Sequence, residues 1–469
     1  MEKTCTGVHA EGRGSCYPNT RAPTIFCGVS ASVTGVTYAR RLGLFSATMA
    51  VIGGIIGGGI FLTPSTVAAR VGSASFILIA WVVGGLVALI GAFCYAELGA
   101  RRPRAGGGYV YLREAWGPLP AFLYGWALLL VIATGAIAAV AVTFASYALA
   151  LVGLSPGLAS PVAVGAIVLL TGVNYVGVKP AAVTQNVFTV LKLAALVALI
   201  AVGLSVSTST AFYRPLPTST VPPSGVVVSL GTALVPILFT YGGWQQTNFI
   251  AEEIIEPERN LPRALVLGVV VVVAVYLLAN LAYLRVLGPG GLATSSAPAA
   301  AEMRAVLGPV GSTIISAGIA VSTFGFLNLV ILVTPRVFQA MATDGVFFPA
   351  LAGLHPVYRT PAAALFLQAT WAIVLTLSGT FGQLVSYVAF GDWIFFGLTA
   401  AGLFVYRARD RLSAPGYRVP GYPWTPLLFV VAAIFVVVSS VRASPMHALI
   451  GAGLIAVGVP VFLLQRRNS

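Results

Sequence analysis

A succession of long apolar stretches constrains the fold of this chain more than any other feature. A membrane-spanning helix needs roughly 20 apolar residues, and about twelve stretches meet that length. They lie at residues 44–68, 74–98, 119–150, 160–177, 183–205, 225–251, 264–287, 309–338, 362–378, 382–406, 425–441 and 446–464. With 58% hydrophobic and only 8% charged residues, the composition excludes a soluble domain. We predict an all-α integral membrane protein with about twelve transmembrane helices.

The basic residues are distributed unevenly over the connecting loops. When successive loops are assigned to alternate sides, 20 of the 26 Lys and Arg residues fall on one side and five on the other, with Lys192 inside a helix. The positive-inside rule places the basic side, and with it both termini, in the cytoplasm. The net charge of +14 therefore indicates orientation in the cell (cytoplasmic) membrane, and no nucleic-acid partner is expected.

Two of the apolar stretches are interrupted by glycine, at 52–61 (IGGIIGGGIF) and 239–245 (FTYGGWQ). Unpaired backbone groups are tolerated at membrane depth only where they line a cavity or bind a ligand. Because four intact helices separate the two breaks, each break begins a five-helix unit, and the two units have opposite orientation. The predicted divisions are a disordered cytoplasmic tail (1–39), a first inverted repeat (40–205), a linker with a second inverted repeat (206–406) and two final helices (407–469).

The two interruptions form the candidate binding site. The half-helix after the first break would present N–H groups and a positive dipole end to a carboxylate. The half-helix before the second break would present carbonyl groups to an ammonium, and the rings of Phe239 and Trp244 could cover a side chain. An α-amino acid zwitterion fits such a site better than the alternative that the glycines only permit close helix packing. The candidate residues are Ile56, Gly57, Gly58, Gly59, Phe239, Tyr241, Gly242, Gly243 and Trp244.

Lys192 is the one basic side chain placed well inside a predicted helix, where insertion costs about 2.5–3.5 kcal/mol. Two roles are open for it as a coupling residue. It could be a neutral proton acceptor, or it could bind the carbonyls of the first break in place of a metal cation. The alternative is that its amine reaches a nearby membrane interface.

The remaining titratable residues do not indicate an enzyme. Four acids at 252–258 are followed by Arg259 and Arg263, which predicts ion pairs at the inner end of the second broken helix. No nucleophile, metal-ligand cluster or phosphate-binding loop accompanies them. Three cysteines before residue 39 lack the spacing of a metal site. We expect no catalytic residue, no cofactor and no metal.

Several longer motifs extend the pattern and carry a resemblance to a known family. They are GIIGGGIF at 54–61, PRAGGGYVYLREAWGP at 103–118, LK at 191–192, FTYGGWQQTNFIAEEIIEPERNLPRA at 239–264, PRVFQAMATDGVFFP at 335–349 and VPGYPWTP at 419–426. With these motifs the chain resembles the amino acid-polyamine-organocation (APC) superfamily. Within it, the chain is similar to the L-type amino acid transporters and the bacterial serine/threonine exchangers.

The resemblance implies a LeuT-type 5+5 inverted repeat with helices 1 and 6 unwound at the midplane, and alternating access. It assigns residues 57–59 to the substrate carboxylate, 239–243 to the amino group and gating, and Lys192 to the place of a sodium ion, which implies sodium-independent transport. The chain departs from its relatives at Gly58, where Ser or Thr is usual, and at Gly108, where Glu is frequent. L-type relatives in animals pair with a glycoprotein through an extracellular cysteine, but no cysteine falls in the predicted outer loops here. We therefore expect no covalent partner subunit.

These observations together predict a permease that moves amino acids by sodium-independent exchange or proton-linked uptake. Neutral substrates are expected, because the predicted pocket offers no acidic side chain. Its partners are then the amino acid and the lipid bilayer, with protons left open as a coupling ion. The alternatives are a cationic amino acid or polyamine transporter of the same superfamily, and an amino acid receptor that does not transport.

Overall fold

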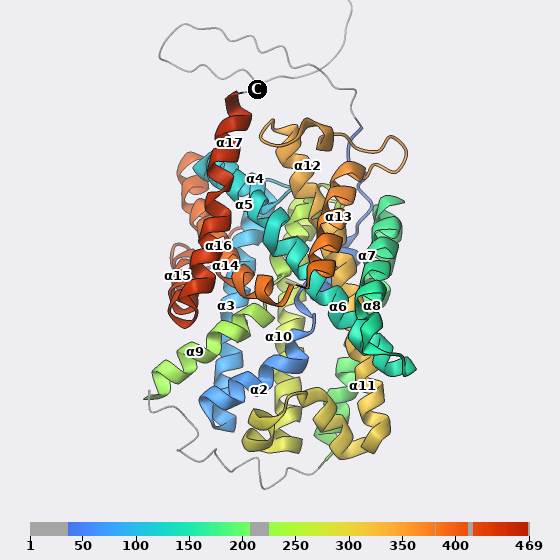
Figure 1. Cartoon of the computed structure of the whole chain (residues 1–469). Coiled ribbons are helices and arrows are strands. Elements are labelled where there is room, and N and C mark those ends of the chain that lie inside the picture. The colour runs from blue at the N-terminus through green and yellow to red at the C-terminus, as the bar shows by residue number, and fades with distance from the viewer. Residues whose placement is uncertain (1–35, 207–224, 380, 411–415, 468–469) are drawn as a thin grey trace, which may run out of the picture. The chain divides into compact units, whose positions relative to one another are not determined.

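The computed structural model describes residues 36–206, 225–379, 381–410 and 416–467, with only the backbone described at 225–227, 381–390 and 466–467. The predicted tail lies outside the described residues up to position 35, with its three cysteines, and the linker lies outside them from 207 to 224. The described residues form helices and no β-strand (Figure 1). Leu42 and Ile254 make an isolated parallel bridge.

The first half of the chain contains the following helices: α1 (Leu44–Ile55), α2 (Gly59–Val71), α3 (Ala74–Arg101), α4 (Gly108–Trp116), α5 (Pro118–Ala127), the π-helix η1 (Leu128–Ile132), α6 (Ala133–Val152), the 3₁₀ turn η2 (Pro156–Leu158), α7 (Ala159–Tyr175) and α8 (Val178–Ser205). The second half contains α9 (Gly225–Thr240), the 3₁₀ helix η5 (Trp244–Glu253), α10 (Pro257–Thr294), α11 (Pro298–Val333), α12 (Pro335–Thr343), η6 (Pro349–Leu351), α13 (Ala362–Ser378), α14 (Phe381–Arg409), α15 (Trp424–Ala443), α16 (Pro445–Ala456) and α17 (Gly458–Arg467).

Each predicted apolar stretch coincides with one helix or with two or three consecutive helices. Within the described residues, eight helical segments are long and apolar enough to cross a membrane, and the bent α1–α2 pair can form a ninth span. The other three predicted spans correspond to α9 with η5, to α13 and to α14, which do not meet that test. The all-α membrane fold is thus confirmed, while the count of twelve spans stays a prediction.

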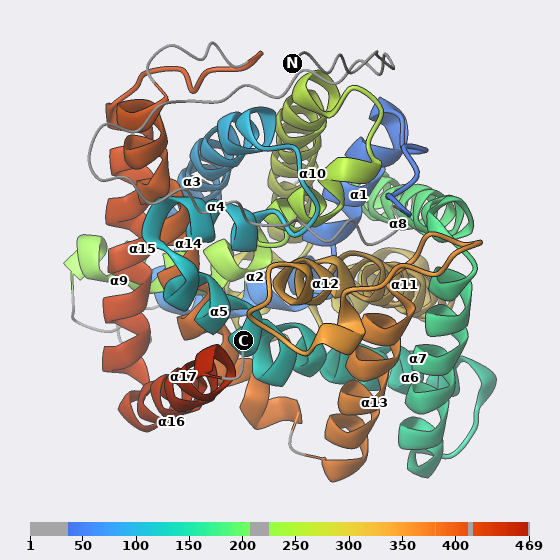
Figure 2. The same cartoon turned by 90° about the horizontal axis from the view of Figure 1, so that it is seen from above.

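Small residues bring the helices into close contact around the two breaks. Helix α10 packs against α1, α2 and α3, and α11 packs against α6 and α8, while α7 and α8 lie at the opposite edge from α15 and α16 (Figure 2). On α3, a Cβ atom at Gly84 would lie only 2.3 Å from the Ile237 side chain. Such close packing of small residues is what holds helices together in lipid, where no hydrophobic force acts between them. Apolar side chains such as Leu86, Leu169 and Leu191 are exposed and suit contact with lipid.

Polar contacts close the end of the bundle where α4 and α12 lie, at the top of Figure 1. The predicted ion pairs of the 252–258 cluster are only partly correct. Glu253 pairs with Arg336 of α12 at 2.8 Å, both fully buried, rather than with a neighbouring arginine, and only the exposed Glu256 comes within 3.9 Å of Arg259. The reason is tertiary packing: the segment at 36–42 covers this end, and both Arg41 and Leu42 donate their N–H groups to the Glu253 carbonyl.

Tyr38 in this covering segment is buried against the same cluster. Its hydroxyl lies 3.3 Å from the Gln339 amide oxygen, and the Arg336 guanidinium lies 5.9 Å from its ring. Burial raises the pKa of the Tyr38 hydroxyl above its usual range, so it stays a neutral donor. On the neighbouring α4, Arg113 pairs with Asp344 at 2.7 Å. These contacts hold the start of α1 and the end of η5 in place.

Candidate functional site

The first predicted interruption is present as a break between α1 and α2. Helix α1 ends at Ile55, Ile56 is extended with φ −78° and ψ 94°, and α2 begins at Gly59 with its axis turned by 43°. The N–H groups of the first turn of a helix have no intrahelical partner. The start of α2 therefore presents N–H donors at the break.

Side chains from two other helices, α8 and α11, donate hydrogen bonds to the carbonyl groups at the break. The Lys192 amine on α8, which is completely buried, donates to the carbonyls of Ile56 at 2.7 Å and Gly53 at 3.2 Å. The Ser322 hydroxyl on α11 donates to the Gly57 carbonyl at 3.0 Å. The contacts of Lys192 are those of a group that binds the carbonyls of the break, and they exclude an amine that reaches the membrane interface.

The second predicted interruption lies between α9 and η5. Helix α9 ends at Thr240, residues 241–243 form a turn, and η5 begins at Trp244. Gly243 has φ +107°, a conformation that an L side chain rarely adopts. The last carbonyl groups of α9 have no partner within the helix, so this break presents acceptors.

The two breaks are in direct contact. A Cβ atom at Gly243 would lie 2.0 Å from the Gly54 carbonyl oxygen, so the two backbones touch at this point. The Tyr276 hydroxyl of α10 lies 3.1 Å from the Ile55 carbonyl and 3.5 Å from the Thr240 carbonyl, and so connects the ends of α1 and α9. The start of α2 also meets the end of α9, since a Cβ atom at Gly59 would lie 2.9 Å from the Thr240 side chain.

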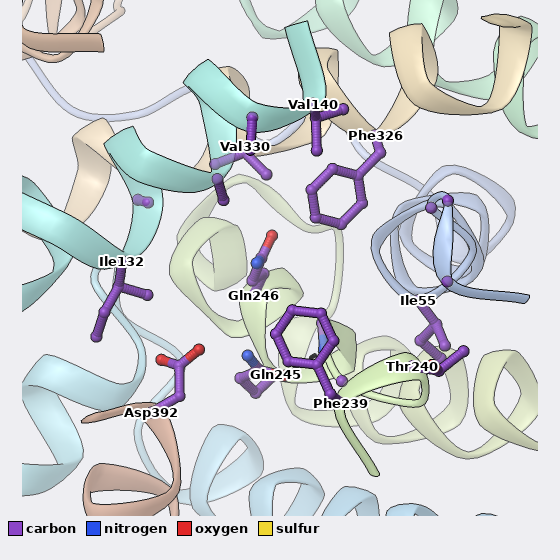
Figure 3. Close-up of a pocket in the computed structure, with 18 of the residues that line it drawn as sticks. Ile55, Ile132, Val140, Phe239, Thr240, Gln245, Gln246, Phe326, Val330 and Asp392 are labelled. Carbon is purple, nitrogen blue, oxygen red and sulfur yellow. Dashed lines mark hydrogen bonds between the residues drawn. The ribbon is translucent and has the colours of Figure 1, made fainter. Parts of the chain in front are cut away.

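A cavity of about 410 Å³ opens beside this contact (Figure 3). Six of the candidate residues line it: Gly57, Gly58, Gly59, Phe239, Gly242 and Gly243. The Phe239 side chain is 48% exposed, and in Figure 3 its ring lies over the cavity. Most of the remaining wall is apolar.

Ile56, Tyr241, Trp244 and Lys192, the other predicted residues, do not line the cavity. Ile56 contributes its carbonyl to Lys192 on the far side of the break. The Tyr241 hydroxyl lies 3.3 Å from the Trp81 carbonyl, and the Trp244 ring packs on Tyr95 at 5.0 Å between centroids. The expectation that the Trp244 ring covers a substrate is therefore not met, because α3 and α15 leave space for this ring in the core.

Three walls of the cavity were not predicted, and one of them comes from α11 and its C-terminal end, with Phe326, Val330 and Thr334. Another comes from α5, η1 and α6, where Tyr124, Ile132 and Thr143 contribute, and no charged residue marks that stretch. The third comes from α14, with Asp392, Trp393 and Phe396. Asp392 overturns the expectation that the pocket has no acidic side chain. A carboxyl group inside an apolar stretch was the signal that could have found it.

Comparisons with known proteins give the family. The profile of the family described as "Amino acid permease" matches residues 42–463. The large neutral amino acids transporter small subunit 2 of Mus musculus is 33% identical over 448 residues, which cover 92% of this chain and 82% of the relative. The b(0,+)-type amino acid transporter 1 of Rattus norvegicus is 34% identical, covering 87% and 83%.

A bacterial relative covers a similar share of the chain. The serine/threonine exchanger SteT of Bacillus subtilis is 32% identical over 433 residues, which span 92% of this chain and 98% of the relative. A family profile that matches most of the chain and relatives above 30% identity over nearly the full length agree with the broken helices and the apolar spans. The chain therefore belongs to the amino acid permease family and is a multi-pass membrane transporter, not an enzyme.

Proposed function

We propose that this permease moves neutral α-amino acids across the cytoplasmic membrane by alternating access, without sodium. The observation that carries the proposal is the contact between Gly243 and Gly54 beside the cavity. Together with the contact between Gly59 and Thr240, it holds the donor end of α2 and the acceptor end of α9 at one place. An α-amino acid has a carboxylate and an ammonium on one carbon, which matches that pairing.

In this proposal each break recognises one pole of the substrate. The N–H groups at the start of α2, at residues 57–59, bind the carboxylate. The carbonyls at the end of α9, near Phe239 and Thr240, bind the ammonium, and the Phe239 ring covers the site. Ile56, Tyr241 and Trp244 then have indirect roles. The Ile56 carbonyl accepts from Lys192, and the side chains of Tyr241 and Trp244 pack in the core and fix the shape of the second break.

Lys192 supplies the positive charge that a bound metal ion would supply elsewhere. Its two donor contacts, to the Ile56 and Gly53 carbonyls, stabilise the open end of α1 without an ion. This arrangement supports sodium-independent transport, by exchange or with proton coupling.

Neutral substrates are proposed because the cavity wall is mostly apolar and because two of the relatives are named for neutral or hydroxyl-bearing amino acids. The proposed topology has both termini in the cytoplasm, with inverted repeats at 40–205 and 206–406. One relative is named a small subunit. A disulfide-linked partner is not part of this proposal, since Cys94, the one cysteine among the described residues, is buried.

Counterflow in proteoliposomes tests the proposal. The purified protein is reconstituted with unlabelled leucine, serine or threonine inside, and the entry of the labelled amino acid is followed with sodium or choline outside. We expect entry of label that does not depend on sodium and is absent from protein-free liposomes. A thermal shift on amino acid addition without any counterflow would instead identify a receptor. An obligatory need for sodium would contradict the role given to Lys192.

A further inference from the structure

Asp392 gives the cavity a chemical preference that the two breaks do not explain. It is the one Asp, Glu, Lys, Arg or His among the described residues that line the cavity. The side chain is partly buried, and no hydrogen bond or ion pair joins it to any described residue. An unpaired carboxylate in a mostly apolar cavity is costly unless a positively charged partner arrives.

The protein does not supply that partner. Lys192, the buried amine of the neighbouring break, donates to two backbone carbonyls and lies outside the cavity wall. Gln246 also lines the cavity, but its side-chain oxygen is buried against the protein and accepts no hydrogen bond from a described residue. The carboxyl group of Asp392 therefore has no cationic partner in the cavity wall, which makes the site complementary to a hydrogen-bonding cation.

The position of Asp392 fits the end of a substrate side chain. It comes from α14, while the proposed carboxylate and ammonium contacts come from α2 and α9. Figure 3 shows its carboxyl group across the cavity from Ile55 and Thr240, with Gln245 and the Phe239 ring between them. A substrate held by its α-carbon groups at the breaks would extend its side chain in this direction.

We propose that Asp392 forms a side-chain subsite that binds a terminal ammonium or guanidinium group. The permease then accepts α-amino acids with a long cationic side chain in addition to neutral ones. This inference rests on the proposed function, because it takes the two breaks as the place of the α-carbon groups.

A matched pair of substrates tests the subsite. Lysine and norleucine have the same four-carbon chain and differ by the terminal ammonium. Wild type should show counterflow of both. The Asp392→Asn variant should raise the half-saturating concentration of lysine at least ten-fold and that of norleucine less than three-fold. The Asp392→Glu variant should retain most of the lysine transport, since it keeps the charge.

The control is Glu258→Gln, which makes the same chemical change at an exposed acid on the first turn of α10. This variant should leave the half-saturating concentrations of lysine and norleucine unchanged. If lysine neither enters nor competes with labelled norleucine in wild type, the subsite does not exist, whether or not the variants fold. The subsite would also be contradicted if Asp392→Asn changed the half-saturating concentrations of lysine and norleucine by the same factor, or shifted the pH profiles of both transport rates equally. If neither norleucine nor any other amino acid showed counterflow, the proposed function itself would be contradicted.

Discussion

Replacing Gly243 by alanine should break the contact between the two interrupted helices. The methyl carbon would lie 2.0 Å from the Gly54 carbonyl oxygen and 2.7 Å from its carbon, whereas ordinary contact begins near 3.4 Å. The obstacle is backbone, which cannot rotate aside as a side chain can. The φ of +107° adds a strain of about 1–3 kcal/mol for a residue with a Cβ.

Relief requires the two backbones to separate, which weakens the Tyr276 contacts to the Ile55 and Thr240 carbonyls by about 1 kcal/mol each. Together these terms lower the free energy of unfolding by about 3–5 kcal/mol, in the range of severe single substitutions. The unfolding midpoint of purified Gly243→Ala should fall clearly below that of wild type, and counterflow should fall at least ten-fold.

Gly165→Ala is the matched control. Gly165 lies within α7, and no atom would come within 4 Å of a Cβ atom there. Alanine is favoured over glycine inside a helix by roughly 0.5–1 kcal/mol, so this variant should be as stable as wild type or slightly more so. If Gly243→Ala matched Gly165→Ala in midpoint and in transport, the argument that the two breaks interlock would be wrong.

Three further predictions concern buried polar groups. Lys192→Met should reduce counterflow at least ten-fold, because two carbonyls of the first break lose a donor worth about 1–3 kcal/mol each. Gly203→Ala should lower the unfolding midpoint, since its Cβ would lie 2.1 Å from a Glu302 carboxyl oxygen, and Glu302→Ala in the same chain should restore part of it. Arg336→Met should cost about 3–5 kcal/mol by leaving Glu253 buried and unpaired, and adding Glu253→Gln should recover most of that loss in the same thermal assay. Additive effects in either double variant would contradict the contact concerned.

The apolar helices and both breaks could be predicted because each depends on local sequence. Every backbone N–H and C=O group in lipid must be hydrogen-bonded. An apolar stretch of sufficient length therefore predicts a helix, and a glycine run within it predicts an interruption. The helical turns at the start of α11 were missed for a related reason: residues 298–308 are less apolar, and Gly308, with φ +66°, separates them from the rest of α11.

The cavity walls and ion pairs could not be predicted in the same way. Which face of α14 turns toward the cavity depends on packing against α15 and α4, and the uniformly apolar sequence around Asp392 has no periodicity that reveals it. Glu253 was assigned to its sequence neighbours, but its partner Arg336 lies 83 residues further along the chain. Trp244 shows the same limit, since an aromatic residue next to a break can face the substrate or the core.

The Lys192 amine, bound to the carbonyls of α1, has an electrical consequence for transport. A zwitterion that crosses in exchange for another transfers no net charge, and the cation that stabilises the break stays with the protein. The membrane potential then does no work on neutral exchange. A substrate whose extra ammonium engages Asp392 instead moves one elementary charge, worth about 2.3 kcal/mol per 100 mV. Vesicles that are negative inside would thus accumulate lysine in exchange for an internal neutral amino acid. Norleucine would only equilibrate.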